Sequence, residues 1–411
     1  MRILLALHNA FTDCVSGAAR STRTHVAWLA EAGHEVRVLC SARFDAAPPE
    51  SVLAHLASLG LATRAALTPR AVAAHLRRNW PRRRPAAALV FRWREIPVTL
   101  LLTRHHDPTV PDRLEYEQLV LHCDAALDGF QPDLVISYGG HPVVREYLRR
   151  AQARGCVTLF KVHNYGFDDP RWFEPATGVL MPSEFLARRY RDRIGIAATG
   201  IPTPVEWREV LAPAEESRRF VTFVNPSPHK GVTLFARLAA MLGERRPDIA
   251  VMVVQSAADA RLLAGGLGID FTRYPQIVAA PPVPAPRDFL SLSRILLVPS
   301  VFDEPHGRVA VEAMINGIPP LVSERGALPE TVGPGGTVIP LPSWMTPDSL
   351  RLPSEAETAS WFDAVCKLWD DPAHYRDAAA RARAEADARY AEAPLKGRHL
   401  EYIDALVGRR H

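Results

Sequence analysis

The chain has 411 residues, of which 47% are apolar and 23% charged, with a formal net charge of +4 at pH 7. This length exceeds what one hydrophobic core usually fills, so we expect two domains, and the composition argues against extensive disorder and against membrane spanning. Five cysteines without C-x-x-C spacing argue against a disulfide framework or a zinc site. The expected location is therefore the cytoplasm.

The first half of the chain alternates apolar runs with helical patterns. Ile3 to Leu7 is too short for a membrane-spanning helix and is expected to be a buried strand. A helix is predicted from Thr24 to Ala32, which Gly33 ends, and a second strand from Glu35 to Cys40. This order predicts a βαβ opening to a parallel α/β domain. Further predicted elements are strands at Ala88 to Arg92, Asp133 to Ser137, Val157 to Val162 and Gly178 to Pro182, and a helix at Val143 to Ala153.

A proline-rich segment near Gly200 to Pro204 marks the predicted domain boundary. The second half then repeats the alternation of strands and helices, and the alanine- and arginine-rich tail is expected to be helical. We predict domains over residues 1–205 and 213–385 and a terminal helix over residues 386–411. The predicted elements of the second half are strands at Phe220 to Val224, Ala250 to Val254, Gln276 to Ala279, Ile295 to Pro299 and Pro320 to Ser323, and helices at Val232 to Gly243 and Arg308 to Asn316.

The segment from Pro299 to Pro319 is the most informative about function. A predicted strand ends at Pro299, a loop carries Glu304, and Gly307 opens a helix. The unpaired N–H groups at the start of a helix, together with its dipole, favour a bound diphosphate. Glu304 is then placed to accept hydrogen bonds from sugar hydroxyls, and Glu312 to accept them from a ribose diol.

The string P-S-x-x-x-E-P-x-G-x-x-x-x-E-A-M, which begins at Pro299, resembles the E-x7-E signature of glycosyltransferase family four and its GT-B relatives. The resemblance implies a GT-B fold, in which two Rossmann-like, doubly wound parallel-sheet domains face an interdomain cleft and the terminal helix packs back on the first domain. It implies a retaining transferase that moves a hexose-type sugar from a nucleoside-diphosphate sugar and needs no cofactor. His306, Gly307 and Arg308 then fall in the donor-binding loop.

Phe223 to Gly231 resembles the family's strand and loop that end in Lys-Gly, which implies that Lys230 contacts the donor diphosphate. A cation there offsets the charge that develops on the leaving nucleoside diphosphate. The chain has Asn225 where the family has an arginine, so one expected cation is missing. Arg308 is a candidate replacement. We count Glu304, Lys230 and His163 as the catalytic candidates.

In the first domain, Ser16 and Gly17 lie in a small-residue loop after the first strand, where backbone N–H groups can approach a phosphate or an acceptor. Gly140 and His141 follow another predicted strand and form a second loop of the same kind. His163 ends a predicted strand, at the edge where open α/β sheets bind ligands. The resemblance implies that His163 contacts the donor sugar.

The loops that would select the acceptor carry few recognisable motifs. The acceptor can therefore be a glycan, a lipid-linked sugar or a small molecule. Arg77 to Arg84 is a basic run with one tryptophan, which suits peripheral contact with the inner membrane face or with a phosphorylated acceptor. No nucleic-acid partner is expected. The chain has no D-x-D motif, so no metal site on the diphosphate is predicted.

Two other functions stay open. A Rossmann oxidoreductase predicts G-x-G-x-x-G after the first strand, whereas that loop holds only Gly17, and an acidic residue after the second strand, which instead ends in Leu39-Cys40-Ser41. A catalytically silent GT-B-like protein that binds nucleotide sugars is compatible with the missing arginine at position 225.

Overall fold

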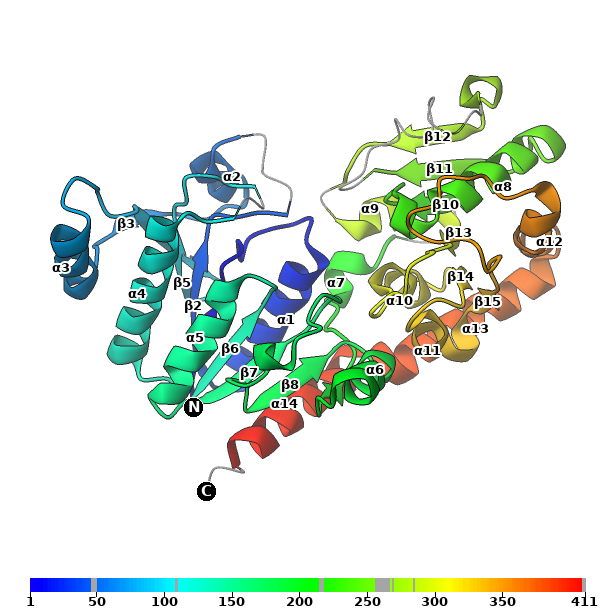
Figure 1. Cartoon of the computed structure of the whole chain (residues 1–411). Helices are drawn as coiled ribbons and strands as arrows, with labels where there is room; N and C mark the ends of the chain where they lie inside the picture. Colours follow the sequence, from blue (N-terminus) through cyan, green and yellow to red (C-terminus); the bar gives the residue numbers. More distant parts are fainter. Residues whose placement is uncertain are drawn as a thin grey trace. The chain divides into compact units, whose positions relative to one another are not determined.

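The computed structural model describes residues 1–45, 50–107, 110–213, 218–255, 267, 270–283 and 285–408. Within these residues the chain divides into two compact units, one of Met1–Ile201 with Lys396–His411 and one of Pro202–Leu395. Each unit holds one open sheet with helices on it (Figure 1).

The described strands of the first unit form a nine-stranded sheet in the order β3-β4-β5-β2-β1-β6-β7-β8-β9. Pairing is parallel from β5 through β2 to β9, whereas β3, β4 and β5 pair in antiparallel fashion. The strands are β1 (Arg2–Ala6), β2 (Glu35–Ser41), β3 (Arg64–Ala66), β4 (Ala88–Trp93), β5 (Ile96–Leu101), β6 (Leu134–Tyr138), β7 (Val157–Lys161), β8 (Gly178–Met181) and β9 (Thr199–Gly200).

The antiparallel edge departs from the predicted all-parallel pattern. Strands β4 and β5 are joined by Arg94 and Glu95, whose φ angles are 46° and 65°. Positive φ at two consecutive residues is typical of a type I′ hairpin turn, a position that usually carries Asn or Gly. Because neither residue signals a turn, β5 was not predicted from the sequence.

The helices of the first unit are α1 (Gly17–Glu31), α2 (Val52–Ser58), α3 (Arg70–Asn79), α4 (Arg113–Phe130), α5 (Pro142–Ala153), α6 (Glu184–Ile194) and most of α14 (Glu392–Gly408). Helix α1 begins seven residues before the predicted start at Thr24, because Ser16 caps it by accepting a hydrogen bond from the Ala19 amide. Helix α14 packs on this unit, where Tyr402 Oη donates to the Val179 carbonyl oxygen.

The described strands of the second unit form an all-parallel, six-stranded sheet in the order β12-β11-β10-β13-β14-β15. Its strands are β10 (Phe220–Val224), β11 (Ala250–Val254), β12 (Ile277–Ala280), β13 (Ser293–Val298), β14 (Pro320–Ser323) and β15 (Thr337–Ile339). Its helices are α7 (Trp207–Val210), α8 (Val232–Arg245), α9 (Pro286–Leu290), α10 (Arg308–Ile315), α11 (Leu328–Val332), α12 (Glu355–Asp370) and α13 (Pro372–Tyr390).

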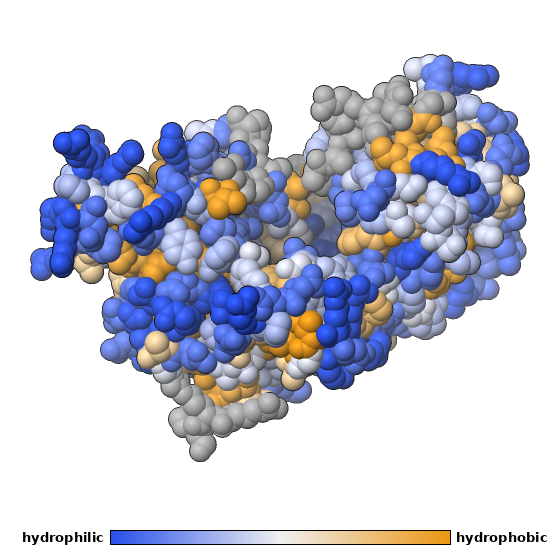
Figure 2. Space-filling model, in the orientation of Figure 1, coloured by the Kyte–Doolittle hydropathy of each residue, from blue (hydrophilic) through white to orange (hydrophobic). Residues whose placement is uncertain are grey.

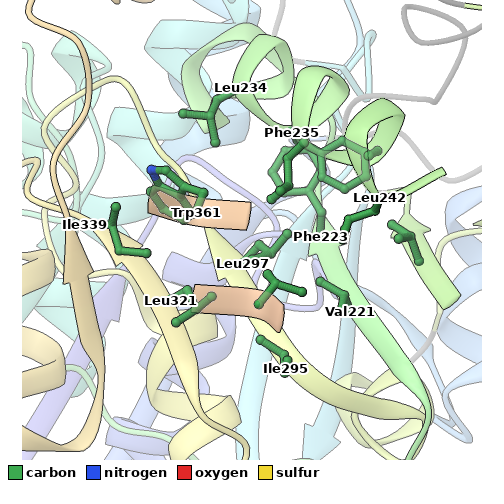
Figure 3. Packing of buried hydrophobic residues seen from close by; sticks show 14 of the residues in the cluster. Val221, Phe223, Leu234, Phe235, Leu242, Ile295, Leu297, Leu321, Ile339 and Trp361 are labelled. Atoms are coloured by element: carbon green, nitrogen blue, oxygen red, sulfur yellow. The ribbon is translucent and has the colours of Figure 1, made fainter. Parts of the chain in front are cut away.

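Both faces of this second sheet are buried. On one face Val221 and Phe223 of β10 pack with residues of α8 and α12, where Phe223 stacks on Phe235 with ring centroids 4.5 Å apart and Trp361 is fully buried (Figure 3). On the other face Met252 and other alternate residues pack with α10 and α13. Side chains of a strand alternate between faces, so this double burial explains the continuous apolar runs in the sequence.

Among the described residues, no helix is long and apolar enough to cross a membrane.

Candidate functional site

The loop between β13 and α10 holds Glu304 in a fixed, nearly buried position. Its side chain is 5% exposed, and its Oε1 accepts hydrogen bonds from Ser300 Oγ and from Lys230 Nζ, both at 2.6 Å. The backbone of Glu304 pairs with Gly326, and its carbonyl oxygen accepts from the Ala327 amide at 2.8 Å. The carboxylate therefore lies at the carboxyl end of the sheet with its orientation set from both sides.

Lys230 reaches this carboxylate from the loop that follows β10. It ends a short 3-10 helix, η3 (Pro228–Lys230), and its ammonium lies 5.0 Å from the centre of the Phe302 ring. Gly231, with φ of 82°, turns the chain into α8, and a Cβ at this position would collide with the Pro299 carbonyl oxygen. The Lys230 side chain is 30% exposed, whereas that of Glu304 is 5% exposed.

The start of α10 is built around Gly307. Its φ of 85° lies in the left-handed region, which favours glycine, and a Cβ there would also press on the Leu328 side chain. Arg308 is the first residue of α10, and its Nε donates to Glu312 Oε1, one turn further along the helix, at 2.8 Å. Arg308 Nη1 donates to the Pro204 carbonyl oxygen at 3.1 Å. Arg308 thus neutralises the nearly buried Glu312 side chain, which is 5% exposed.

His306 is buried beneath the same loop. Its Nδ1 lies 3.1 Å from Thr203 Oγ1, its ring packs against Tyr390, and its backbone oxygen accepts from Thr331 Oγ1. Burial, with Arg308 and Arg389 nearby, lowers the pKa of the His306 ring to about 3, so the ring is neutral. In this structure His306 supports the loop, and its predicted contact with the donor stays a prediction.

Asn225 directly follows β10, with φ of 62°. Its amide donates to the Val254 carbonyl oxygen at 2.9 Å, and its carbonyl oxygen accepts from Ser227 at 2.7 Å. Asn tolerates left-handed backbone better than arginine does. The backbone therefore gives a physical reason for asparagine at the position where a cation was expected.

In the loop after β1, the Asp13 carboxylate accepts hydrogen bonds from backbone amides. Asp13 is 2% exposed, and its Oδ1 accepts from the Val15 amide at 2.8 Å and the Ser16 amide at 3.0 Å, while Oδ2 accepts from the Asp45 amide at 2.7 Å. The Ser16 N–H that was expected to face a phosphate is thus donated to a carboxylate of the chain itself. Gly17 begins α1 directly after it.

The loop after β6 meets His8, which follows β1. His141 caps α5 by accepting from the Val143 amide at 3.2 Å, and its ring centroid lies 5.0 Å from that of His8. Gly139, which precedes Gly140, has φ of 113°, and a Cβ there would lie 2.8 Å from His8 Cε1. Burial, His141 and Arg43 lower the pKa of His8 to about 3. Burial and Arg43 lower the pKa of His141 as well.

A buried lysine ends β7, two residues before His163. Lys161 is 3% exposed, its Nζ donates to Thr22 Oγ1 of α1 at 3.4 Å, and burial lowers its pKa to about 7. His25 of α1 is also buried, and burial, Lys161 and two neighbouring histidines lower its pKa. The ring of His163 lies edge-on to Tyr138, with centroids 5.2 Å apart.

Four of the residues predicted from the sequence form two contacts on the second unit, Glu304 with Lys230 and Arg308 with Glu312, and their roles stay predictions. Sequence reasoning missed His8, His25 and Lys161 on the first unit. The one available signal for Lys161 was the scarcity of lysine, since only four of the 49 basic residues are lysines.

Part of the chain is similar to known glycosyltransferases. Residues 205–346 match the family model described as "Glycosyl transferases group 1". The chain is 24% identical over 264 residues to a lipopolysaccharide 1,2-N-acetylglucosaminetransferase of Salmonella typhimurium, covering 58% of this chain and 67% of that protein. It is 29% identical over 188 residues to a D-inositol 3-phosphate glycosyltransferase of Pseudarthrobacter chlorophenolicus, covering 44% of this chain but only 41% of that protein.

Solved structures match over nearly the whole chain. Sucrose-phosphate synthase from Thermosynechococcus elongatus superimposes with a TM-score of 0.69 at 16% identity, covering 99% of each chain. HepE from Anabaena, in complex with UDP and glucose, gives a TM-score of 0.66 at 16% identity and covers 98% of this chain and 100% of that one. The chain therefore has the GT-B glycosyltransferase fold, and the segment that matches the glycosyl transferases group 1 family contains Asn225, Lys230, Glu304 and Glu312.

Proposed function

We propose that this protein is a retaining, metal-independent glycosyltransferase of family four that transfers a hexose-type sugar from a nucleoside-diphosphate sugar to an acceptor hydroxyl. The observation that carries the proposal is the buried Glu304 carboxylate, held by Ser300 and Lys230 directly before the N-terminus of α10. This places a carboxylate, an exchangeable ammonium and a helix start at one sheet edge. The E-x7-E motif is then formed by Glu304 and Glu312.

In the proposed reaction, Lys230 and the first amides of α10 bind the diphosphate, Glu304 accepts hydrogen bonds from sugar hydroxyls, and Glu312 accepts them from the ribose. The bond between the anomeric carbon and the phosphate oxygen breaks while the acceptor oxygen bonds to that carbon on the same face. The acceptor proton passes to the leaving phosphate oxygen. Lys230 offsets the charge that develops on that oxygen.

In this proposal, donor binding changes the partners of two basic side chains. Lys230 leaves Glu304 for the diphosphate, which frees Glu304 Oε1 for a sugar hydroxyl. Arg308 leaves Glu312 in the same way, which frees that carboxylate for the ribose and makes the guanidinium available as the second diphosphate cation. His163, Gly140, His141, Ser16 and Gly17 complete the proposal on the first unit, as sugar and acceptor contacts.

For the acceptor, the proposal covers a glycan, a lipid-linked sugar or a small molecule. The Salmonella relative is named for lipopolysaccharide and the Pseudarthrobacter relative for an inositol phosphate, so both named substrates carry hydroxyl groups. The proposal places the protein in the cytoplasm with peripheral contact at the inner membrane face through Arg77 to Arg84. No nucleic-acid partner and no cofactor are part of it.

A thermal-shift screen of UDP-, GDP- and ADP-sugars tests donor binding, because a ligand at a hundred times its dissociation constant stabilises a protein by about 2.7 kcal/mol. Sugar transfer or donor hydrolysis is then compared between the wild type and Glu304→Gln. We expect the variant to lose about a hundredfold in rate, since a lost transition-state contact of this kind costs about 3 kcal/mol. Asp303→Asn, next in the same loop, is the matched control and should keep the rate.

Two outcomes contradict the proposal in different ways. A thermal shift with none of the nucleotide sugars removes donor binding itself. A clear shift without any transfer or hydrolysis by the wild type favours instead the silent binding protein, for which Asn225 at the expected cation position is the supporting observation.

A further inference from the structure

The charges of this chain are unevenly distributed along its sequence. Between Ser51 and Arg94 there are nine arginines and neither aspartate nor glutamate, so this stretch carries +9 and the remaining residues together carry −5 of the net +4. Charge concentrated in this way creates a local potential that the net charge of the whole protein does not reveal. The stretch contains α2, β3, α3 and β4, of which β3 and α3 lie at the far left of the first unit in Figure 1.

Helix α3 has an apolar inner face and a basic outer face. Val72 and Leu76, four residues apart, are buried. Arg70, Arg77 and Arg78 are exposed, and at 100° per residue they lie within about a third of a turn of one another, opposite the buried pair. The surface over α3, at the left of Figure 2, is strongly hydrophilic. The helix therefore presents guanidinium groups outward.

The residues that follow α3 extend this basic face. Trp80 is half-buried, and its Nε1 donates to Glu117 Oε2 of α4 at 2.8 Å, which fixes the end of the helix. Glu117 also accepts from Arg113. Arg82, Arg83 and Arg84 are exposed, and within the described part of the chain none of these three, nor Arg77 or Arg78, forms an ion pair. Their charge is therefore not neutralised by the described residues.

An apolar side chain lies beside these arginines in the sequence. Leu67 joins β3 to α3, three residues before Arg70, and is 95% exposed, more than any other large apolar residue described. A leucine in water forgoes the free energy that it would gain from an apolar environment. Basic side chains beside an exposed leucine are typical of surfaces that bind at the headgroup and acyl boundary of a bilayer.

We propose that the face from Arg64 to Arg84 docks the protein on an anionic lipid bilayer, with its arginines at the headgroup phosphates and Leu67 inserted below them. This inference specifies the peripheral membrane contact of the proposed function. It rests on the proposed function only in that a lipid-linked acceptor would explain why the protein binds a membrane. A nucleic acid fits less well, because the single tryptophan is half-buried with its N–H occupied and leaves no stacking platform.

Co-sedimentation of the full-length protein with vesicles tests this docking. Vesicles of phosphatidylcholine alone are compared with vesicles that contain about one third phosphatidylglycerol, at two salt concentrations, without any nucleotide. We expect binding to the anionic vesicles only, weakened by salt. Each arginine near such a surface contributes roughly a fivefold gain in partition, so replacing Arg77, Arg78, Arg82, Arg83 and Arg84 by glutamine should lower binding at least a hundredfold.

The matched control removes the same charge elsewhere. It replaces five exposed arginines outside the stretch by glutamine: Arg191, Arg273, Arg376, Arg381 and Arg398. This control should keep most of the binding, and equal loss in both variants would overturn the proposal. Circular dichroism and the nucleotide thermal shift, measured on each variant, show that the fold and the donor site are intact, so failure of docking is distinguished from failure of donor binding.

Leu67→Ser separates a bilayer from other polyanions. Loss of an inserted leucine should lower vesicle binding about tenfold with little dependence on salt, and should leave binding to heparin or RNA unchanged. Two results would overturn the proposal: equal binding to neutral and anionic vesicles, or tight binding to heparin or RNA with none to anionic vesicles, which would instead assign the face to a soluble polyanion.

Discussion

The two units hold their polar groups at the sheet edge in opposite ways. On the second unit opposite charges pair, Lys230 with Glu304 at 2.6 Å and Arg308 with Glu312 at 2.8 Å. On the first unit Lys161 is buried without a carboxylate partner among the described residues: its Nζ donates to the Thr22 hydroxyl, and burial lowers its pKa to about 7. Lys230 and Arg308 are thus paired with carboxylates, whereas burial disfavours the charged form of Lys161.

This difference matters for the proposed function, because a paired cation can change its anionic partner, whereas a lysine that is largely neutral cannot bind an anion through its charge. In the proposed function, an incoming diphosphate replaces Glu304 as the partner of Lys230, whose side chain is partly exposed. Lys161 is charged only at a free-energy cost, since desolvation disfavours its charged form. At the end of β7, Lys161 therefore offers a hydrogen-bonding group rather than a fixed charge.

The largest expected effect is on the stability of the first unit. The native pKa of Lys161 is about 7 and the unfolded value is 10.5, so between these values the unfolded state binds more protons and the free energy of unfolding rises with pH. At pH 7 and below the cost is fully present. Lys161→Met should therefore be more stable by several kcal/mol at pH 7, because each pH unit of pKa shift is worth about 1.4 kcal/mol.

Urea unfolding between pH 6 and 10 measures this effect, with Lys367→Met, an exposed lysine of α12, as the control. The variant should lose the rise that the wild type shows over that range, and the control should keep it. Parallel curves for wild type and Lys161→Met would mean that Lys161 stays charged in the native state, and the contrast between the units would disappear.

The next largest effect is expected at the paired site. Lys230→Ala removes the ammonium that binds the diphosphate in the proposed function, and should weaken transfer by about a hundredfold. Donor affinity and rate are compared with those of Lys367→Ala. In the double variant with Glu304→Gln, the loss of transfer rate should be smaller than the product of the two single losses, because the effects of residues in contact are coupled. Fully multiplicative losses would show that the two residues act independently and that their observed contact is not coupled in catalysis.

How much of this could be read from the sequence differs between the units for a physical reason. On the second unit, strand end, glycine and helix start lie within one short segment, so local rules placed Glu304, Gly307 and α10 correctly. On the first unit, Lys161 and Thr22 are 139 residues apart, and only the tertiary fold brings them into contact. The contacts of Asp13 with three amides are likewise invisible in the pattern that predicted a phosphate-facing loop.

One local contact was nevertheless missed. Arg308 and Glu312 are four residues apart on one helix, a spacing at which opposite charges pair. Sequence reasoning assigned both to the ligand and overlooked that they satisfy each other without one. The antiparallel edge of the first sheet was missed because its turn residues, Arg94 and Glu95, do not signal a turn.

A smaller effect is expected for the exchange at α10. If Arg308 supplies the second diphosphate cation, Arg308→Ala should weaken donor binding by about tenfold, the value of one charge-assisted hydrogen bond. Isothermal titration with the nucleotide that gives the largest thermal shift measures it, with Arg325→Ala as a control from the loop after β14. Unchanged affinity in Arg308→Ala together with lost affinity in Asn225→Ala would reject the compensation and leave Arg308 as a partner of Glu312 alone.

The smallest effect separates backbone from charge at Asn225. With φ of 62°, this residue adopts a conformation that glycine reaches freely and alanine does not. Asn225→Gly should leave the free energy of unfolding nearly unchanged, whereas Asn225→Ala should lower it by about 1 kcal/mol. Both variants remove the same side-chain amide, so their difference in urea unfolding reports the backbone alone, and any loss of donor affinity common to both reports the amide. Equal stability of the two variants would show that left-handed backbone does not explain why asparagine stands here, and the missing cation would again need a functional reason.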